Sequence, residues 1–222
     1  MQEFNKVTLE TIDTTGVMRF NDPDAMNAVS NEMLDGIWSC LNEIEDINSN
    51  IKCLVITGEG RGFCAGANLS GGSDRGNTGR QDAGHRLETG YHPILRRIKN
   101  LKIPLITSVN GPAAGVGMSL ALMGDLILAG KSAFFLQAFR RIGLVPDGGS
   151  TWLLPRLVGM ARAKELAILG ERLSAEKAFE WGLINRLYED NKLHDETLKL
   201  AKELSHGPMS VSYTHLTLPT TD

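Results

Sequence analysis

The sequence is poor in cysteine, poor in aromatic residues and free of any large excess of one charge. Its 222 residues include three cysteines, Cys40, Cys53 and Cys64, and aromatic side chains make up 6%. Because the cysteines form no Cys-x-x-Cys pair and no histidine stands at ligand spacing, the pattern excludes a disulfide scaffold and a structural zinc site. It favours a reducing compartment, and we expect a cytoplasmic protein.

Charge and hydropathy exclude two further classes of partner. The chain has 23 Lys and Arg against 26 Asp and Glu, a formal net charge of -3, and no basic run of the kind that binds nucleic acid. No segment reaches the roughly 18 uninterrupted apolar residues of a membrane-spanning helix. Residues 1–10 lack the apolar core of a signal peptide. We therefore expect neither nucleic acid nor a membrane as a partner.

Two glycine-rich turns dominate what the sequence does contain. They are GRGFCAGAN at 60–68 and NGPAAGVGMSL at 110–120, and they follow short apolar runs at 51–57 and 104–109, which we predict to be buried strands. The second turn leads into a predicted buried helix over 116–123. Two such turns present backbone N–H groups to one oxygen, and losing one donor to an oxyanion costs about 2.7–4 kcal/mol. The pattern indicates a site that stabilises a developing negative charge.

Commoner motifs fit these residues less well. The tripeptide GKS at 130–132 resembles the end of a phosphate-binding loop, but its spacing to the preceding glycine is one residue too long. GEGRG at 58–62 is not the GxGxxG of a dinucleotide fold, and Ser119 lacks the second glycine of a hydrolase nucleophile elbow. We interpret Cys64, inside the first turn, as a small buried thiol rather than as a nucleophile.

The remaining pattern predicts a mixed α/β chain with strands first and helices last. Alternation predicts a hairpin of strands over 6–12 and 16–20, and Ser30 is the predicted N-cap of a helix over 31–47. Further strands are predicted over 125–128 and 133–136, and further helices over 85–98, 161–169, 174–181 and 193–204. The glycine-rich loop 70–80 is either a mobile lid or a solvated connector. One sheet-containing core with a helical C-terminal part follows.

Five segments in the same order give the chain a resemblance to the crotonase, or enoyl-CoA hydratase/isomerase, superfamily. They are NDPDAMNAVS at 21–30, CLVITGEGRGFCAGANL at 53–69, VNGPAAGVGMSLAL at 109–122, DLILAG at 125–130 and GLVPDGGSTWLLPRLVG at 143–159. The resemblance implies an α/β fold, a crotonase-type spiral of ββα units with a truncated C-terminal helical region. The implied spiral core covers 1–190, and the helical region starts over 191–210.

The resemblance also implies the substrate and the residues that hold it. The substrate is an acyl-CoA thioester, no cofactor is needed beyond the coenzyme A that the substrate carries, and no metal takes part. The thioester oxygen accepts hydrogen bonds from the N–H groups of Ala67 and Val116. Val116 stands where relatives have glycine, which requires a backbone conformation that valine adopts, as in the first turn of a helix. The other implied substrate-binding residues are Ala25, Ala65, Gly66, Asn68, Gly115, Gly117 and Phe139.

The chemistry depends on which side chain moves protons. Hydratases of this superfamily carry two glutamates at the positions of Ser119 and Phe139, so the resemblance disfavours hydration. Asp147 matches the catalytic aspartate in the branch of 1,2-epoxyphenylacetyl-CoA and enoyl-CoA isomerases. We predict an isomerase in which Asp147 transfers the proton and an apolar wall that includes Phe139 raises its pKa. The acyl group is either aromatic-derived or a straight-chain 3-enoyl group.

Other readings stay open at this point. Asp147 in Pro-Asp-Gly is also a good turn or helix-cap residue. An enoyl-CoA hydratase, a non-catalytic member that binds an acyl-CoA or a protein, and an inactive fragment are the alternative functions.

The end of the chain departs from the resemblance. Residues 211–222 are rich in threonine and look appended, where relatives continue with helices that cover the pocket and join subunits. We therefore expect the homotrimer or hexamer of the relatives in a weakened form. We interpret one short basic group as a solvated helix face rather than a CoA phosphate site: Arg96, Arg97, Lys99 and Lys102. Four scattered histidines receive no role: His85, His92, His194 and His206.

Overall fold

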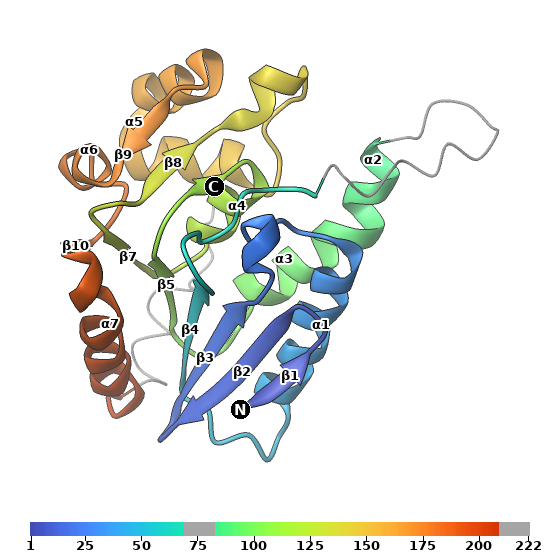
Figure 1. The fold of residues 1–222 in the computed structure, drawn as a ribbon, viewed down its shortest axis with the longest axis vertical. Helices are drawn as coiled ribbons and strands as arrows, with labels where there is room; N and C mark the ends of the chain where they lie inside the picture. Colours follow the sequence, from blue (N-terminus) through green and yellow to red (C-terminus); the bar gives the residue numbers. More distant parts are fainter. Residues whose placement is uncertain (69–82, 209–222) are drawn as a thin grey trace, which may run out of the picture.

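A seven-stranded mixed sheet forms the centre of the molecule in the computed structural model, which describes residues 1–68 and 83–208 (Figure 1). The sheet runs in the order β1 (Gln2–Phe4), β2 (Val7–Ile12), β3 (Thr15–Phe20), β4 (Cys53–Gly58), β5 (Leu105–Val109), β7 (Leu126–Gly130) and β10 (Arg186–Tyr188). The first two pairings are antiparallel, which confirms the predicted hairpin, and the other four are parallel. The predicted lid at 70–80 and the tail at 211–222 lie outside the described residues.

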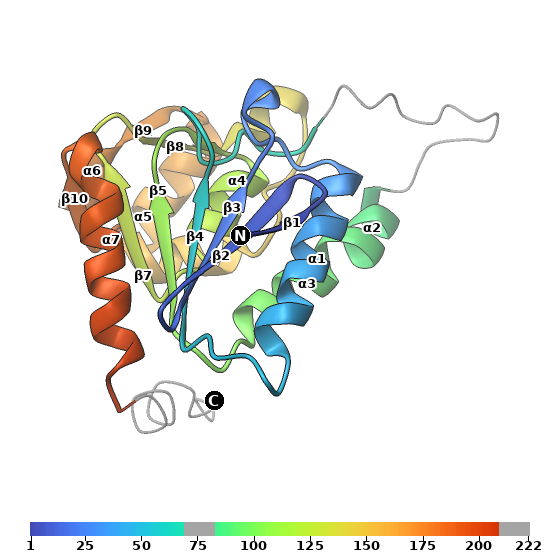
Figure 2. The same cartoon turned by 60° about the horizontal axis from the view of Figure 1, so that its bottom comes forward.

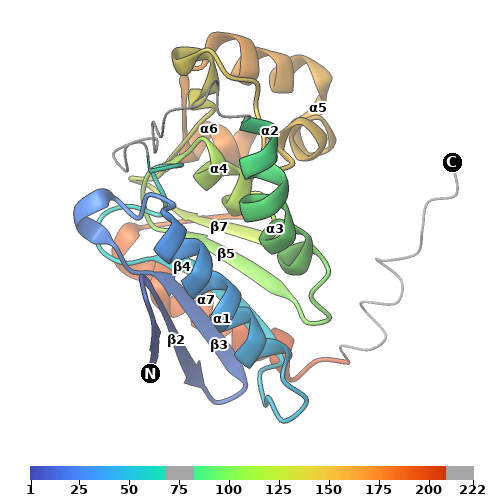
Figure 3. The ribbon, with the colours of Figure 1, turned by 90° about the vertical axis from the view of Figure 1, so that its right-hand side faces the viewer.

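A smaller sheet lies beyond one end of the large sheet. It consists of β6 (Ala113–Ala114), β8 (Phe134–Leu136) and β9 (Arg172–Ser174), with β8 in the middle. Beside it lie α4 (Val116–Ala121), α5 (Ser150–Leu169) and α6 (Ala175–Glu180) (Figure 3). The glycine turns after β4 and β5 point toward this end, because parallel strands carry their following turns to the same edge of a sheet.

Helices cover both faces of the large sheet (Figure 2). One face packs against α1 (Asn31–Glu45), and α3 (His92–Lys99) packs against α1. The chain reaches α3 through α2 (Ala83–Arg86) and a π-helical turn (Leu87–Tyr91). The opposite face packs against α7 (Asp190–Ser205). Short 3-10 turns, Pro23–Ala25 and Ala138–Ile142, complete the described elements. Across residues 1–68 and 83–208, no helix has both the length and the apolar character needed to cross a membrane.

This double cover explains why four consecutive residues of β4, 53–56, are apolar instead of alternating with polar residues. Leu54 and Ile56 join the main core under α1, whereas Cys53 and Val55 join a second cluster with Leu200 of α7 and its neighbours. Successive side chains of a strand point to opposite faces, so a strand covered on both faces buries every residue. All of β4 is buried, as its sequence predicts.

The helix after the hairpin begins where the sequence predicts. The Oγ of Ser30 accepts a hydrogen bond from the backbone N–H of Met33 over 3.2 Å, which satisfies one free donor of the first turn. One face of α1 is then fully buried, with Ile37 and Leu41 at its centre. A side chain of this size contributes about 1.5–3 kcal/mol when it is removed from water. The helix therefore fixes the chain that enters β4 and the first glycine turn.

The predicted strand over 125–128 is shifted, because β7 covers Leu126–Gly130, and the predicted helix over 161–169 is only the second half of α5. Gly159, at φ 80° and ψ 161°, interrupts α5 and separates its two halves. The predicted boundary after residue 190 falls in the first turn of α7, whose buried side chains pack on the sheet.

Candidate active site

The first glycine turn is held by two asparagine side chains. Asn27 Oδ1 accepts from the Asp22 N–H over 2.8 Å, and Asn27 Nδ2 donates to the carbonyls of Glu59 and Gly62 over 2.9 and 2.8 Å. Asn27 is completely buried and sits at φ 56°, a left-handed conformation that asparagine tolerates. From the other side, Asn110 Nδ2 donates to the Gly60 carbonyl over 2.9 Å. The turn is therefore fixed by side chains to which sequence patterns assign no role.

The end of this turn presents the N–H of Ala67. Val29 and Ala67 form an isolated parallel bridge, in which the Val29 N–H donates to the Gly66 carbonyl over 2.7 Å and the Asn68 N–H donates to the Val29 carbonyl over 3.0 Å. In a parallel bridge of this kind, one residue supplies both its N–H and its carbonyl to the two bonds, and here that residue is Val29. The N–H of Ala67 consequently points away from Val29, and the residue is exposed.

The second turn presents the N–H of Val116 at a helix start. Gly115 lies at φ 53° and ψ -127°, a region open to glycine alone, and its N–H donates to the Leu136 carbonyl over 2.9 Å. Val116 is the first residue of α4, and its φ is not positive. The backbone condition for valine at this position is therefore met, because Gly115 takes the unusual conformation instead. The first N–H groups of a helix have no partner inside the helix.

The two turns are in direct contact. The Ala114 N–H donates to the Cys64 carbonyl and the Cys64 N–H donates to the Pro112 carbonyl, each over 3.0 Å. A Cβ placed on Gly66 would lie 2.8 Å from the Ala114 carbonyl oxygen and 3.8 Å from the Gly115 Cα. Gly66 and Gly115, the residues that precede the two candidate donors Ala67 and Val116, thus pack against each other.

An aspartate turn and an aromatic ring close the site. A Cβ on Gly115 would lie 3.9 Å from Phe139 Cζ, and Phe139 is only 5% exposed. A Cβ on Gly148 would lie 2.7 Å from Ser119 Cβ and 3.3 Å from Val116 Cγ2. Asp147, the residue before Gly148, is thereby held against α4.

The Asp147 carboxyl group has an unusual environment. Its Oδ1 is buried and, within residues 1–68 and 83–208, meets no hydrogen-bond donor. Burial raises the pKa of Asp147 above its ordinary value, and the charge of His92 opposes this rise. The predicted direction of the shift is confirmed. A buried carboxyl oxygen without a donor is costly to ionise and is well suited to accept a proton.

The backbone of Asp147, not its side chain, makes the turn. Its carbonyl accepts from Ser119 Oγ over 2.9 Å, from Ser150 Oγ over 2.9 Å and from the Ser150 N–H over 3.1 Å. The N-cap of α5 is Gly149, which has no side-chain cap bond. The alternative in which the Asp147 carboxylate caps this helix is therefore wrong.

The other predicted substrate-binding residues lie around these turns. Ala25 is half-buried in the Pro23–Ala25 turn, and the carbonyl of the next residue, Met26, accepts from the Ala65 N–H over 3.0 Å. Ala65 is exposed and Asn68 is half-buried. Gly117 is buried in α4, where a Cβ would lie 2.2 Å from the Cys64 carbonyl oxygen. Gly117 therefore allows the two turns to pack closely together. Because it is buried, it is not positioned to contact a ligand.

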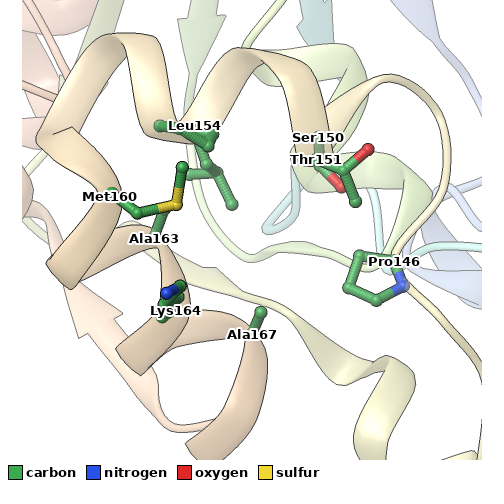
Figure 4. Close-up of a pocket in the computed structure, with 9 residues that line it drawn as sticks. Pro146, Ser150, Thr151, Leu154, Met160, Ala163, Lys164 and Ala167 are labelled. Carbon is green, nitrogen blue, oxygen red and sulfur yellow. The ribbon is translucent and has the colours of Figure 1, made fainter.

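Two cavities border the Asp147 turn. The larger, about 310 Å³, is lined by His92, Leu95, Arg96, Lys99, Met123, Gly148 and Gly149. The smaller, about 160 Å³, lies between the two halves of α5 and the turn, and its lining is mainly apolar (Figure 4). Pro146 and Ser150, the residues on either side of the Asp147–Gly149 turn, both line the smaller cavity. The Asp147–Gly149 turn therefore lies between a larger cavity that is lined by cationic side chains and a smaller one that is mainly apolar.

The cysteines contribute no nucleophile. Burial raises the pKa of the Cys64 thiol to about 12, with a smaller opposing contribution from a backbone hydrogen bond, and Cys64 is fully buried. Cys40 and Cys53 are likewise buried, and burial raises the pKa of each to about 12. A thiol reacts as its thiolate, so the interpretation of Cys64 as a packed thiol agrees with its environment.

Two glycine turns thus meet at the end of a mixed sheet, next to the Asp147 turn. The family described as "Enoyl-CoA hydratase/isomerase" matches residues 10–217, and the chain belongs to this family, within the crotonase superfamily.

Individual relatives are similar over most of the chain. It is 45% identical to 1,2-epoxyphenylacetyl-CoA isomerase of Escherichia coli over 195 residues, 87% of this chain and 74% of that protein. It is 36% identical to a probable enoyl-CoA hydratase of Rhodobacter capsulatus over 205 residues, 92% of this chain and 77% of that protein. The solved enoyl-CoA hydratase/isomerase of Cupriavidus metallidurans superposes with a TM-score of 0.87 at 33% identity, over 95% of this chain and 78% of that one. The predicted crotonase fold is confirmed.

Proposed function

We propose that this protein is an acyl-CoA isomerase in which Asp147 is the single acid and base. The observation that carries the proposal is the buried Asp147 Oδ1, which meets no donor among the described residues and stands beside the second glycine turn. A base of this kind gains its partner when a substrate C–H approaches. The similarity to an isomerase that acts on 1,2-epoxyphenylacetyl-CoA supports the same choice.

The proposed reaction begins with the thioester carbonyl between the N–H groups of Ala67 and Val116. Asp147 takes a proton from the acyl carbon next to the carbonyl, the C–H electrons form the enolate, and the negative charge on oxygen is stabilised by the two N–H donors. The same carboxyl group then returns the proton to another carbon and the carbonyl re-forms. Atoms and electrons balance without a further cofactor, since coenzyme A is part of the substrate.

Two neighbouring side chains make hydration the weaker candidate. Ser119 and Phe139 stand where the resemblance places the hydratase glutamates. Ser119 Oγ is buried and donates to the Asp147 carbonyl, and Phe139 offers only an apolar ring. Neither side chain carries a carboxylate that could activate a water molecule as a general base near neutral pH. We therefore assign the acid-base role to Asp147 and favour isomerisation over hydration.

The acyl group is either aromatic-derived or a straight-chain 3-enoyl group. The test is incubation of both classes of CoA thioester with the protein in heavy water, followed by mass spectrometry, beside Asp147→Asn. We expect deuterium uptake with isomerised product for the wild type, and a loss of at least about 100-fold in the variant. A product heavier by one water would favour a hydratase, and binding without exchange would favour a non-catalytic member.

The same variant has a stability signature. A folded-state pKa raised above the unfolded value means that the contribution of Asp147 to stability is present at low pH and is lost as the pH rises through the folded pKa. Asp147→Asn removes this cost. We therefore expect it to melt at a higher temperature than the wild type at pH 7, with the difference shrinking at low pH. Equal melting temperatures at all pH values would contradict the burial of an ionised Asp147.

We also propose that copies of the chain associate through the surface around α5. Several large apolar side chains there are half or more exposed: Ile142, Leu144, Val145, Trp152 and Met160. An apolar patch of this kind marks an interaction surface. Light scattering across a concentration series should show reversible growth in mass, and a monomer at every concentration would refute this association.

A further inference from the structure

The larger cavity beside Asp147 carries a histidine to which sequence spacing assigns no role. His92 lines this cavity together with Gly148 and Gly149, the two residues that follow Asp147. It is the first residue of α3, directly after the π-helical turn Leu87–Tyr91, and Pro93 follows it. Such π-turns are rare, and they occur frequently at functional sites. The local irregularity brings an imidazole from a helix distant in sequence to the Asp147 turn.

Glu88 fixes the orientation of this ring. His92 Nδ1 lies 2.9 Å from Glu88 Oε1, and this hydrogen bond is the main reason why the pKa of Glu88 is lowered. Because an ionised carboxylate only accepts, Nδ1 carries the proton of this bond. Nε2 is then the ring atom on the opposite edge, away from Glu88. When Nε2 is protonated as well, the ring is a cation held in one orientation.

The other cations of the cavity are less sheltered. The His92 side chain is 30% exposed, whereas that of Arg96 is 67% exposed and also leans on Glu88, with 3.5 Å between Nη2 and Oε2. Lys99 is exposed. On the α4 side, Ser119 contacts the Asp147 backbone and carries no charge. Water screens an exposed cation strongly, so the half-buried imidazole is the charge that acts most effectively on a half-buried carboxylate.

We propose that His92, oriented by Glu88, is a positioning residue for Asp147: from the wall of the cavity that Gly148 and Gly149 also line, its imidazolium acts on the Asp147 carboxylate and holds it ionised, ready to accept a proton. The proposal rests on the role of Asp147 as the base. Burial favours the protonated form of this carboxyl, which cannot take a second proton. The charge of His92 opposes the effect of burial and lowers the Asp147 pKa.

This role predicts a shift of the pH profile. The value of kcat/KM falls as the pH drops through the pKa of Asp147 in the free enzyme. His92→Gln removes the cation, so the Asp147 pKa rises and the acidic limb moves to higher pH. We expect kcat/KM for deuterium exchange to be at least threefold lower in His92→Gln than in the wild type at pH 6. This difference should become smaller as the pH rises. Glu88→Gln should also move the acidic limb of the kcat/KM profile to higher pH, but by a smaller amount.

Two further variants separate charge from packing. His92→Lys restores a cation and should return the limb toward the wild-type position, which a purely structural role would not do. His194→Gln, on the exposed face of α7, is the matched control and should leave the profile unchanged. Thermal melts of each variant identify any that fail to fold. An unmoved limb in folded His92→Gln, or a His92→Lys limb that matches His92→Gln, overturns the proposal.

The experiments distinguish a failure of the role of His92 from a failure of the proposed function. If Asp147→Asn keeps full exchange activity, the base has been assigned wrongly, and both proposals fail. If Asp147→Asn is inactive while the His92→Gln limb stays in place, only the role of His92 fails.

Discussion

In the proposed mechanism the two glycine turns offer the same group, a backbone N–H, but they are stabilised by different interactions. The first turn buries Phe63 and Cys64, ends at the exposed Ala67 and is held by the amide side chains of Asn27 and Asn110. The second is buried, with Val116 only 4% exposed at the start of α4, and it depends on one glycine in a conformation closed to other residues. One donor therefore depends on side-chain hydrogen bonds and the other on backbone conformation.

Gly115→Ala should give the largest effect. A Cβ at φ 53° and ψ -127° introduces strain of about 1–3 kcal/mol, which the chain relieves by rotating the peptide that carries the Val116 N–H. Loss of one oxyanion donor lowers kcat by about 100- to 1000-fold. Steady-state kinetics should show this loss of turnover. Calorimetry should show a smaller loss of affinity for an acyl-CoA.

Gly182→Ala is the matched control for this variant. Gly182 also has a positive φ of 76° and lies on the surface, and a Cβ added there would meet no other atom within 4 Å. It should lose stability by a similar amount and keep its turnover. Equal losses of activity in both variants would mean that strain alone, and not the donor, explains the effect.

Asn27→Ala should have a smaller effect on turnover and a clear effect on stability. It leaves the Asp22 N–H and the Glu59 carbonyl without their partner, at about 1–3 kcal/mol for a buried unsatisfied group, and leaves the Gly62 carbonyl with only the longer bond of 3.4 Å from Asn110 Nδ2. Because the rest of the first turn keeps its other bonds, we expect a roughly tenfold loss of kcat. Urea unfolding gives the stability, and Asn48→Ala, at an exposed position, is the control. Unchanged turnover would show that the first turn holds its shape without this clamp.

Val116→Gly should have the smallest effect on activity. The N–H donor stays, so we expect kcat within about threefold of the wild type. The lost burial of the valine and the added helix glycine together cost about 2–4 kcal/mol of stability. Kinetics at a temperature well below the melting point test this, and a large loss of kcat would show that the valine side chain takes part in substrate binding.

The sequence predicts this site better where local chemistry determines structure than where tertiary contacts do. Ser30 and the apolar face of α1 indicate a helix start, and the unbroken apolar run of β4 indicates a buried strand. The first half of α5 is not predicted, because proline and glycine usually end a helix. In the structure Pro155 lies inside the first half of α5, and Gly159 lies between the two halves. The short strand β10 depends on pairing with β7 and has no signal of its own.

The same distinction applies to the candidate site. The resemblance of five motifs leads to Ala67, Val116 and Asp147, and the structure brings all three turns together. The sequence does not predict a role for Asn27 or His92, because their neighbours in the structure are distant in sequence. Asn27 contacts Gly62, and His92 lies beside the Asp147 turn. A lone asparagine or histidine carries no pattern that predicts its partner. The Glu88–His92 spacing of four residues on a helix was the one local signal present.

The most direct test of the account is the infrared spectrum of a saturated acyl-CoA, labelled with ¹³C at the thioester carbonyl and bound to the wild type and to Gly115→Ala. If the N–H groups of Ala67 and Val116 donate to one oxygen, the carbonyl stretch should move to lower frequency on binding, and much of this shift should disappear in the variant. A bound thioester that absorbs at its solution frequency, or a shift that Gly115→Ala leaves intact, would contradict the oxyanion site.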